Sequence, residues 1–110
     1  MGVMGVTGLS DFRKRVYTVT AMIPKGYVAT YRQIAEALGS SKYARAVGNA
    51  LHANPFPSEQ VPCHRVIRSD GVVGGYARGT QLKTQMLQSE GVEIKDGRIN
   101  LGKNMIKFKV

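Results

Sequence analysis

Apolar side chains repeat every three or four residues between Ser10 and Pro24. The repeat consists of Phe12, Val16, Val19 and Ile23. This spacing places the four side chains on one face of a helix. Ser10 is a favoured residue before a first helical turn, and Pro24 cannot continue a helix. The pattern therefore predicts an amphipathic helix between these two residues.

A second helix is predicted from Thr30 onwards. Thr30 and Gln33 have the spacing of a capping box, in which the side chain of each residue bonds to the backbone of the other. Gly39 follows the apolar positions of this segment and suits the left-handed residue that ends many helices. The helix is therefore expected to end at Gly39.

A third helix should begin near Ser41 or Lys42 and stop before Pro55. Two short helices joined by a tight turn form a helix-turn-helix unit. Spacing puts Arg45, Asn49 and His52 on one face of the third helix, opposite Val47 and Leu51. Most of its other residues are alanine or glycine, so the helix could approach a nucleic-acid groove closely. The same small residues would also permit tight packing in a core, and the pattern alone leaves both interpretations open.

Short apolar runs after residue 60 predict two hairpins. The run Val66-Ile67-Arg68 should pair with Val72-Val73 across the turn at residues 69–71. Residues 92–94 should pair with residues 98–101 around Asp96-Gly97, followed by a basic tail with Lys103, Lys107 and Lys109.

A last helix is predicted between the two hairpins, with Thr80 as its cap and Gly91 at its end. Its inward side chains should be Leu82, Met86 and Leu87. Glu90 lies four residues after Met86, so a carboxylate is in line with the apolar stripe. Burying a carboxylate without a partner is costly.

These elements predict an α/β fold that is mostly α: a winged-helix-like domain with a helix-turn-helix unit and a small β-hairpin. Residues 1–9 contain glycines and lack periodicity, so we expect a flexible tail there. Residues 10–110 should form a single domain, since a chain of 110 residues is too short for two stable cores.

Charge adds a prediction about the partner. There are 16 lysines and arginines against 7 aspartates and glutamates, a net charge of +9. Such an excess favours an acidic partner, most commonly nucleic acid, although solubility alone is an alternative.

The single cysteine excludes an intrachain disulfide and indicates a reducing, intracellular compartment. No structural zinc site is expected, and no apolar run approaches the roughly 18 residues that span a membrane.

Cys63 and His64 are adjacent, and Arg65 follows. A thiol becomes a strong nucleophile as a thiolate, which requires a nearby base or positive charge. Adjacent side chains of an extended segment point to opposite faces, so contact requires a bend at Pro62 or a bridging water. Glu90 is the candidate that would orient the imidazole. The alternative, an inert buried cysteine, stays open at this point.

The segment Val61-Pro62-Cys63-His64-Arg65-Val66 resembles the active-site signature of the O6-alkylguanine-DNA alkyltransferases, also called methylated-DNA–protein-cysteine methyltransferases. The resemblance covers Phe12 to Gly91. It continues in the expected order through Tyr31-Arg32-Gln33-Ile34-Ala35, Ala44-Arg45-Ala46-Val47-Gly48, Asn54-Pro55, Gly75-Tyr76 and Ser89-Glu90-Gly91.

This resemblance implies a direct-reversal DNA repair enzyme that uses no cofactor and no metal. It would bind duplex DNA in the minor groove as a monomer, flip the alkylated guanine out, and transfer the alkyl group irreversibly to Cys63. The location would be cytoplasmic, or nuclear in a eukaryote.

The resemblance also assigns roles residue by residue. The catalytic set is Cys63 as alkyl acceptor, His64 as base through a water, Glu90 orienting His64, Asn54 bracing the loop, and Tyr31 turning the phosphate and donating to guanine N3. The guanine pocket would be formed by Tyr76, Ala77 and the backbone around Val66. Arg45 would fill the gap left by the flipped base. Further DNA contacts are expected from Arg13, Arg32, Ser40, Lys42 and Ser69.

Two departures from the family qualify these expectations. Many members carry an additional N-terminal domain, whereas about ten residues precede the first predicted helix here, so the zinc site of some relatives is not expected. Ala77 and Arg78 occupy pocket-rim positions where relatives vary, which leaves the range of accepted alkyl groups open.

Two rival functions remain. The short alkyltransferase-like proteins are non-enzymatic lesion sensors of similar length that recruit excision repair, but they replace the acceptor cysteine, usually by tryptophan. A plain helix-turn-helix regulator would explain the charge and Arg45. It would leave Cys63, His64 and Glu90 without a role.

Overall fold

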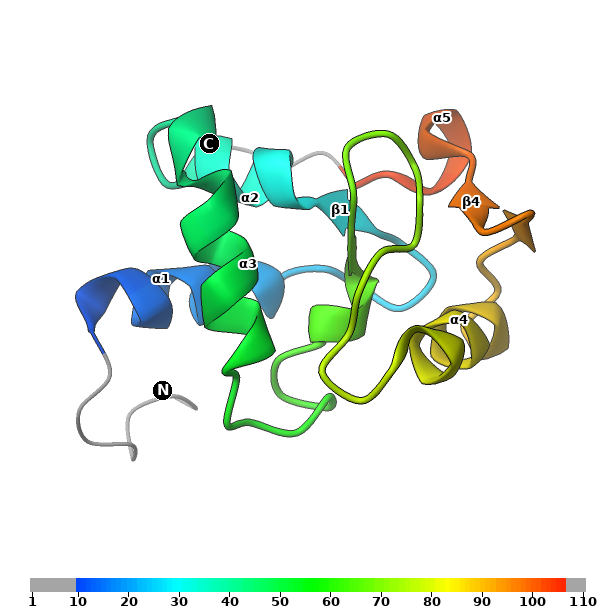
Figure 1. The fold of residues 1–110 in the computed structure, drawn as a ribbon, viewed down its shortest axis with the longest axis horizontal. Helices are drawn as coiled ribbons and strands as arrows, with labels where there is room; N and C mark the ends of the chain where they lie inside the picture. Colours follow the sequence, from blue (N-terminus) through cyan, green and yellow to red (C-terminus); the bar gives the residue numbers. More distant parts are fainter. Residues whose placement is uncertain (1–9, 107–110) are drawn as a thin grey trace.

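The computed structural model describes residues 10–106, so the predictions for residues 1–9, Lys107 and Lys109 lie outside the described range. The helices are α1 (Asp11–Thr20), α2 (Tyr31–Ala37), α3 (Ala44–His52), α4 (Thr80–Ser89) and α5 (Leu101–Asn104), with 3-10 turns η1 (Ser41–Tyr43) and η2 (Cys63–Arg65). The strands are β1 (Ala29–Thr30), β2 (Val66–Ile67), β3 (Ile94–Lys95) and β4 (Arg98–Ile99). The mostly helical fold with a helix-turn-helix unit and a β-hairpin is confirmed (Figure 1).

Helix α1 begins where the sequence predicted and ends earlier. The hydroxyl of Ser10 accepts a hydrogen bond from the backbone N–H of Arg13 over 3.2 Å. The helix ends at Thr20, and tighter backbone bonds continue the chain to Ile23, whose N–H donates to the Thr20 carbonyl over 3.1 Å. Tyr17 is fully buried on this helix, although the apolar repeat did not include it.

The helix-turn-helix unit is built as predicted. Gln33 N–H donates to the Thr30 hydroxyl over 3.0 Å, and the Gln33 side-chain oxygen accepts from Thr30 N–H over 2.9 Å, which completes the capping box. Gly39 adopts φ 123° after α2, and the N–H of Ser40 donates to the Ala35 carbonyl over 3.1 Å. These bonds form the helix-ending motif that favours glycine and turn the chain toward α3.

The predicted hairpin at residues 66–73 forms only around its turn. Strand β2 pairs in parallel with β1, with Ala29 opposite Val66 and Thr30 opposite Ile67. At the turn, Gly71 N–H donates to the Arg68 carbonyl over 3.0 Å and Arg68 N–H donates to the Val72 carbonyl over 3.0 Å. Val66 and Ile67 do not pair with Val72-Val73, and Val72 also bridges Arg98 of β4. Both residues of β2 are buried, and burial on both faces is typical of a strand in a parallel pair.

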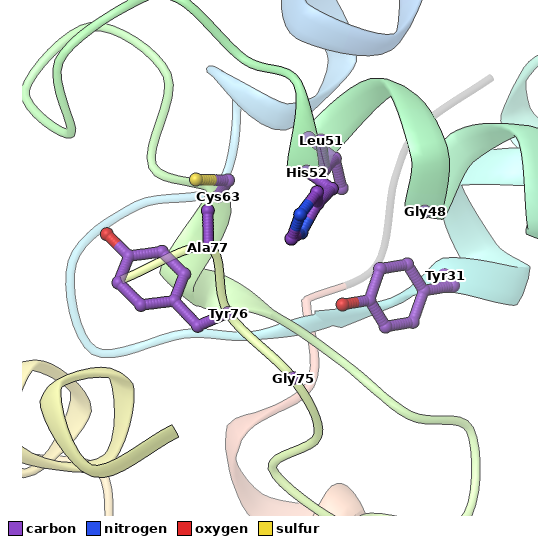
Figure 2. Close-up of a pocket in the computed structure, with 8 residues that line it drawn as sticks. All are labelled: Tyr31, Gly48, Leu51, His52, Cys63, Gly75, Tyr76 and Ala77. Atoms are coloured by element: carbon purple, nitrogen blue, oxygen red, sulfur yellow. The ribbon is translucent and has the colours of Figure 1, made fainter. Parts of the chain in front are cut away.

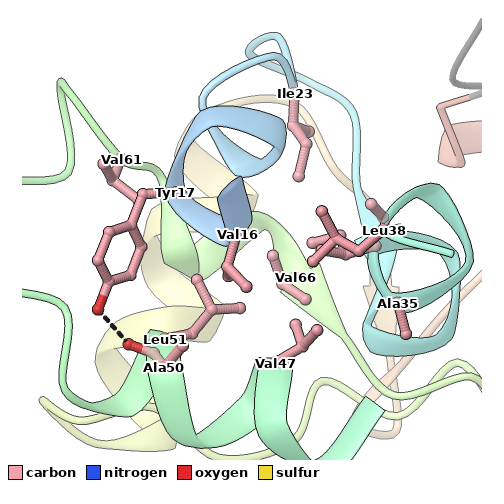
Figure 3. Packing of buried hydrophobic residues seen from close by; sticks show 12 residues of the cluster. Val16, Tyr17, Ile23, Ala35, Leu38, Val47, Ala50, Leu51, Val61 and Val66 are labelled. Carbon is pink, nitrogen blue, oxygen red and sulfur yellow. Dashed lines mark hydrogen bonds between the residues drawn. The ribbon is translucent and has the colours of Figure 1, made fainter. Parts of the chain in front are cut away.

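The β1–β2 sheet lies between two apolar cores. The helical core lies between α1, α2 and α3 and includes Val16, Ile34, Val47 and Leu51 (Figure 3). The hairpin core includes Leu87, Val92 and Ile99. Val66 belongs to the helical core and Ile67 to the hairpin core, because consecutive strand residues face opposite sides. The sheet therefore ties the helix-turn-helix half of the molecule to the half with α4 and the hairpin (Figure 1).

Helix α4 differs from the prediction at its start and agrees at its end. Gly79, with φ 99°, precedes the first turn, and Thr80 is the first helical residue, with its hydroxyl donating to the Gly74 carbonyl over 3.1 Å. At the other end, Gly91 has φ 91° and its N–H donates to the Gln88 carbonyl over 3.0 Å. Thr80 is therefore not the cap, whereas the end at Gly91 is confirmed.

The C-terminal hairpin is confirmed around its turn, but its strands are shorter than predicted, and Leu101 begins α5, which the sequence analysis did not predict. Strands β3 and β4 pair antiparallel, with Ile94 opposite Ile99. Asp96 and Gly97 have φ of 53° and 75°, the two positive values that a two-residue hairpin turn of this kind requires. Between residues 10 and 106, no helix is long and apolar enough to cross a membrane.

Candidate active site

Cys63 lies on a sharp bend immediately before β2. Pro62 has φ −78° and ψ 67°, and Cys63 N–H donates to the Val61 carbonyl over 2.8 Å, which defines an inverse γ-turn. The 3-10 turn η2 follows at once. The sequence predicted a bend at Pro62, and the structure confirms it. Because the backbone is bent, Cys63 is half-buried while His64 is only 1% exposed.

Asn54 braces the segment that carries Cys63. Its side-chain amide donates to the Phe56 carbonyl over 3.2 Å and to the Val61 carbonyl over 3.5 Å, and its oxygen accepts from Phe56 N–H over 3.0 Å. The same amide lies 3.7 Å from the sulfur of Cys63, within the range of a hydrogen bond to sulfur. Asn54 therefore both holds the loop and places a donor against the thiol.

His64 and Glu90 form a buried hydrogen-bonded pair. Nε2 of His64 lies 2.9 Å from Oε2 of Glu90. An ionised carboxylate only accepts, so we assign the imidazole proton to Nε2. Within residues 10–106 no group bonds Nδ1. Burial lowers the pKa of His64 more than the bond to Glu90 raises it, so the imidazole is neutral near pH 7. A neutral imidazole with an unprotonated Nδ1 can act as a base.

The end of α4 positions Glu90. Val92 N–H donates to the Leu87 carbonyl over 3.0 Å, and both side chains belong to the hairpin core, which completes a Schellman motif at Gly91. Burial acts to raise the pKa of Glu90, but bonds from Arg65 and His64 outweigh it and hold the pKa below its usual value. Glu90 is therefore an anion. Its carboxylate, which interrupts the apolar stripe, has His64 and Arg65 as hydrogen-bond partners.

A cavity of about 270 Å³ opens beside Cys63 (Figure 2). It is lined by Tyr31, Gly48, Leu51, His52, Cys63, Gly75, Tyr76 and Ala77. Figure 2 shows the rings of Tyr31 and Tyr76 on opposite sides of this cavity. Burial raises the pKa of both hydroxyls, and an ionised Cys63 raises it further, so both stay protonated donors.

A second cavity, of about 380 Å³, meets the first at Cys63. The two share Leu51, Cys63, Tyr76 and Ala77, and the second extends along residues 54–58 to Arg78. The thiol thus has room on two sides. The arrangement suits a bulky planar group in one cavity and a substituent pointing past the sulfur into the other.

Lys83 is a site residue that the sequence analysis missed. Its side chain is fully buried, and Nζ donates to the carbonyl of Gly75 over 3.0 Å and lies 5.8 Å from the ring centre of Tyr31. Burial lowers its pKa to about 8, while Cys63 acts in the opposite direction. Lys83, Leu87 and Glu90 follow helical spacing, so the stripe that marked Glu90 also contained this lysine.

The predicted role of Val66 is limited to its backbone. The side chain of Val66 is fully buried in the helical core and lines neither cavity, so only its backbone is available to a bound base.

The small residues of α3 fit both interpretations that the sequence left open, tight packing in the core and an exposed face that could approach a groove. Gly48 lies against the ring of Tyr31 and Ala50 is buried, whereas Ala46 is exposed.

The predicted DNA-contacting residues are accessible. Arg45, Asn49 and His52 are exposed on α3, and His52 also lines the first cavity, so this face of the helix leads to the cavity. Arg13, Arg32 and Ser69 are exposed, Arg32 in a 3.6 Å ion pair with Glu36. Ser40 is half-buried, and its hydroxyl accepts from Lys42 N–H over 3.2 Å. The structure shows the position of these residues and leaves their contacts with DNA as predictions.

Comparison with known proteins connects this geometry to a family. Residues 11–92 match the family model described as 6-O-methylguanine DNA methyltransferase, DNA binding domain. A methylated-DNA–protein-cysteine methyltransferase of Methanothermobacter thermautotrophicus is 42% identical over 95 residues, which are 86% of this chain and 52% of that protein. The chain thus spans about half the length of this curated relative.

Solved structures of related proteins are similar to this chain in fold. The S. pombe Atl1 complex with damaged DNA containing O6-carboxymethylguanine is similar at a TM-score of 0.78 and 36% identity, over 90% of this chain and 97% of that one. A Mycobacterium tuberculosis OGT complex with DNA gives 0.72 and 40%, over 76% of this chain and 50% of that one. The matched residues 11–92 contain Tyr31, Asn54, the turn at Cys63 and Glu90. This chain therefore belongs to the 6-O-methylguanine DNA methyltransferase family.

Proposed function

We propose that this protein repairs O6-alkylguanine in duplex DNA by transferring the alkyl group irreversibly to Cys63. The observation that carries the proposal is the thiol of Cys63 between two cavities, beside a buried His64–Glu90 pair 2.9 Å apart. We also propose that the chain corresponds to the C-terminal, catalytic part of its longer relatives. Residues 10–110 would act as one domain and as a monomer, in the compartment that holds the DNA.

The proposed transfer begins with removal of the thiol proton of Cys63. His64 accepts the thiol proton of Cys63 through a bridging water, and Glu90 stabilises the resulting imidazolium. The thiolate attacks the alkyl carbon, a sulfur–carbon bond forms, and the carbon–O6 bond breaks. The electron pair stays on the departing guanine, which takes up one proton from solvent, while His64 releases the thiol proton to solvent. The products are guanine, a neutral thioether at Cys63 and a neutral His64. Tyr31 donates a hydrogen bond to guanine N3 as this charge develops.

The guanine would occupy the cavity between Tyr31 and Tyr76, with the alkyl group directed past the sulfur toward the second cavity. A base within a duplex cannot reach this cavity, so it must be flipped out at a cost of a few kcal/mol. Arg45 is exposed on α3 and has the length to fill the gap in the stack. Helix α3 would lie in the minor groove, and Lys83 would hold the pocket loop at Gly75 while adding positive charge near the thiolate.

A lesion sensor is the second candidate function. The chain matches almost the whole of the Atl1 chain, which was crystallised with damaged DNA, whereas it matches about half of the OGT chain. Cys63 separates the two functions, because a sensor needs the pocket but no acceptor.

Intact-mass measurement after incubation with a duplex that contains one O6-methylguanine tests the proposal. We expect a gain of one methyl group, localised to Cys63 by peptide mapping, and no gain in Cys63→Ala. An undamaged duplex of the same sequence is the control. Selective binding of the damaged duplex without any mass change would favour the sensor and reject the transferase.

A further inference from the structure

Arg65 lies beside the candidate active site but lines neither of the two cavities. Its Nε donates to Oε1 of Glu90 over 2.9 Å and its Nη2 to Oε2 over 2.8 Å. A third bond runs from Nη1 to the carbonyl of Ile23 over 2.8 Å. The side chains of Arg65 and Glu90 are 16% and 13% exposed, so this pair is largely removed from water.

The two-pronged pairing fixes the plane of the Glu90 carboxylate. Oε2, which accepts from Arg65, is also the atom 2.9 Å from Nε2 of His64. Turning the carboxylate away from His64 would break at least one bond of the arginine fork. A planar guanidinium makes such paired bonds, whereas a lysine ammonium is a single point of charge.

The bond to Ile23 gives this arrangement a fixed support. Ile23 is buried in the helical core just after α1, and its carbonyl holds the outer nitrogen of Arg65. Gly26, three residues further on, has φ 88° and lies so close to the backbone oxygen of Glu90 that an added Cβ would come within 3.3 Å. The segment after α1 therefore contacts both Arg65 and Glu90.

The charges that act on His64 lie on α4, at its end, and in the turn η2 itself. Burial lowers the pKa of His64 most, and Glu90 from the end of α4 raises it. Arg65 in the same turn and Lys83 from α4 both lower it. The adjacent Cys63 is the thiol whose proton His64 would accept. Removing Arg65 would take away one of the two positive charges that lower the pKa of His64 in addition to its burial.

We propose that Arg65 is a positioning residue for the transfer reaction, holding the carboxylate of Glu90 in the orientation in which Oε2 accepts the proton on Nε2 of His64. This inference rests on the proposed function, because orientation of His64 matters only if His64 activates Cys63. Arg65 touches neither the alkylguanine nor the sulfur in this scheme, and it acts on His64 through the orientation of Glu90 and through its own positive charge.

Nitrogen-detected NMR of the two histidines tests the proposal in the free protein, without DNA. His52 is exposed on α3 and serves as an internal reference. We expect the parent to show His64 as the Nε2-protonated tautomer, with a pKa below the ordinary value of about 6.5. Arg65→Met should raise the pKa of His64, whereas Arg65→Lys, which keeps the charge, should restore most of the lowered pKa.

Single-turnover methyl transfer as a function of pH gives the second readout. General-base catalysis contributes roughly 10²- to 10⁴-fold, so Arg65→Met should slow transfer at pH 7 by about 10- to 100-fold, with a larger loss at pH 6 than at pH 8. Arg65→Lys should recover the pH dependence but only part of the rate. Arg98→Met, which removes an exposed arginine on β4 that bonds the Asp70 carbonyl, is the matched control and should transfer like the parent.

Several outcomes would overturn the inference. One is a His64 tautomer and pKa in Arg65→Met equal to those of the parent. Another is a rate loss that is the same at every pH, which indicates a structural role only. If Arg65→Met does not fold, Arg65→Lys decides, and a parent-like rate overturns the proposal. A parent protein that folds but transfers no methyl group rejects the proposed function itself.

Discussion

Lys83 and His64 are two buried bases whose surroundings give them opposite charge states near pH 7. His64 is neutral, because burial lowers its pKa more than Glu90 raises it. Lys83 is mostly charged, because its pKa falls only to about 8. A buried ammonium is costly, and its retention beside Cys63 is typical of a residue that serves chemistry rather than stability.

Lys83→Met is therefore expected to keep or raise stability while slowing transfer. Folding lowers the pKa of Lys83 from 10.5 to about 8, so below pH 8 the parent carries a buried charge that costs on the order of 3 kcal/mol. As the pH rises from 8 to 10.5 the unfolded state binds more protons than the folded state, and the parent gains stability relative to the variant. Urea unfolding of both proteins at pH 7 and pH 10 measures this. A stability gap that is the same at both pH values would contradict the buried-charge account.

Among the single residues of the site, the sequence predicted some and missed others. Glu90 was recognisable because a carboxylate interrupted an apolar stripe. Lys83 lies on the same stripe but was missed, since a lysine near the start of a helix usually reaches solvent. Arg65 pairs with a residue 25 positions away, and no local pattern predicts such a contact.

At the scale of helices and strands, the end of α4 determines where Glu90 lies. The Schellman motif at Gly91 stops α4 so that Glu90 faces His64 and Arg65. The helices were predictable because caps and apolar spacing are local signals. The pairing of β2 with β1 was not, because it joins segments 37 positions apart, Ala29 with Val66, and a nearer partner in Val72-Val73 satisfied the same local pattern.

Gly91→Ala should lower both stability and transfer. An alanine at φ 91° costs roughly 1–2 kcal/mol, and relief of that strain would move Glu90. Gly97→Ala is the matched control, because Gly97 also has positive φ and no described atom lies within 4 Å of an added Cβ at either glycine. We expect similar losses in Tm but a slower transfer rate in Gly91→Ala alone. Equal rate losses in both variants would contradict a specific role for the α4 end.

Arg45→Ala tests the role of α3. We expect the variant to reduce base flipping, followed by the fluorescence of a 2-aminopurine beside the lesion, more than it reduces overall DNA affinity. The reason is that the proposed role of Arg45 is to fill the stack, whereas other cations contact phosphates. Equal reductions in flipping and affinity would count against insertion of this side chain.

At the scale of the whole molecule, residues 10–106 form two cores joined through one short parallel sheet, with Cys63 on the turn that leads into that sheet. Tyr31 on the helix-turn-helix side and Tyr76 on the α4 side therefore meet around one cavity. The sequence predicted the helix-turn-helix unit and the C-terminal hairpin, but not how they are joined. A cavity formed by both halves depends on that junction.

The net charge of +9 predicts strongly salt-dependent DNA binding. Each phosphate neutralised contributes a slope of about −0.9 to the plot of log affinity against log salt. Fluorescence anisotropy between low and physiological salt should give a steep negative slope, and Arg32→Ala should reduce its magnitude by about one contact. A flat plot would show that the charge excess does not serve DNA binding.

The central claim is that Cys63 accepts one alkyl group and is then spent. Quantifying restored guanine by nuclease digestion and chromatography, with methylated duplex in excess over protein, tests this most directly. The account predicts a rapid phase that stops at one guanine per protein molecule and is absent in Cys63→Ala. Repeated turnover beyond one equivalent, or no restored guanine from a folded protein that binds the duplex, would contradict it.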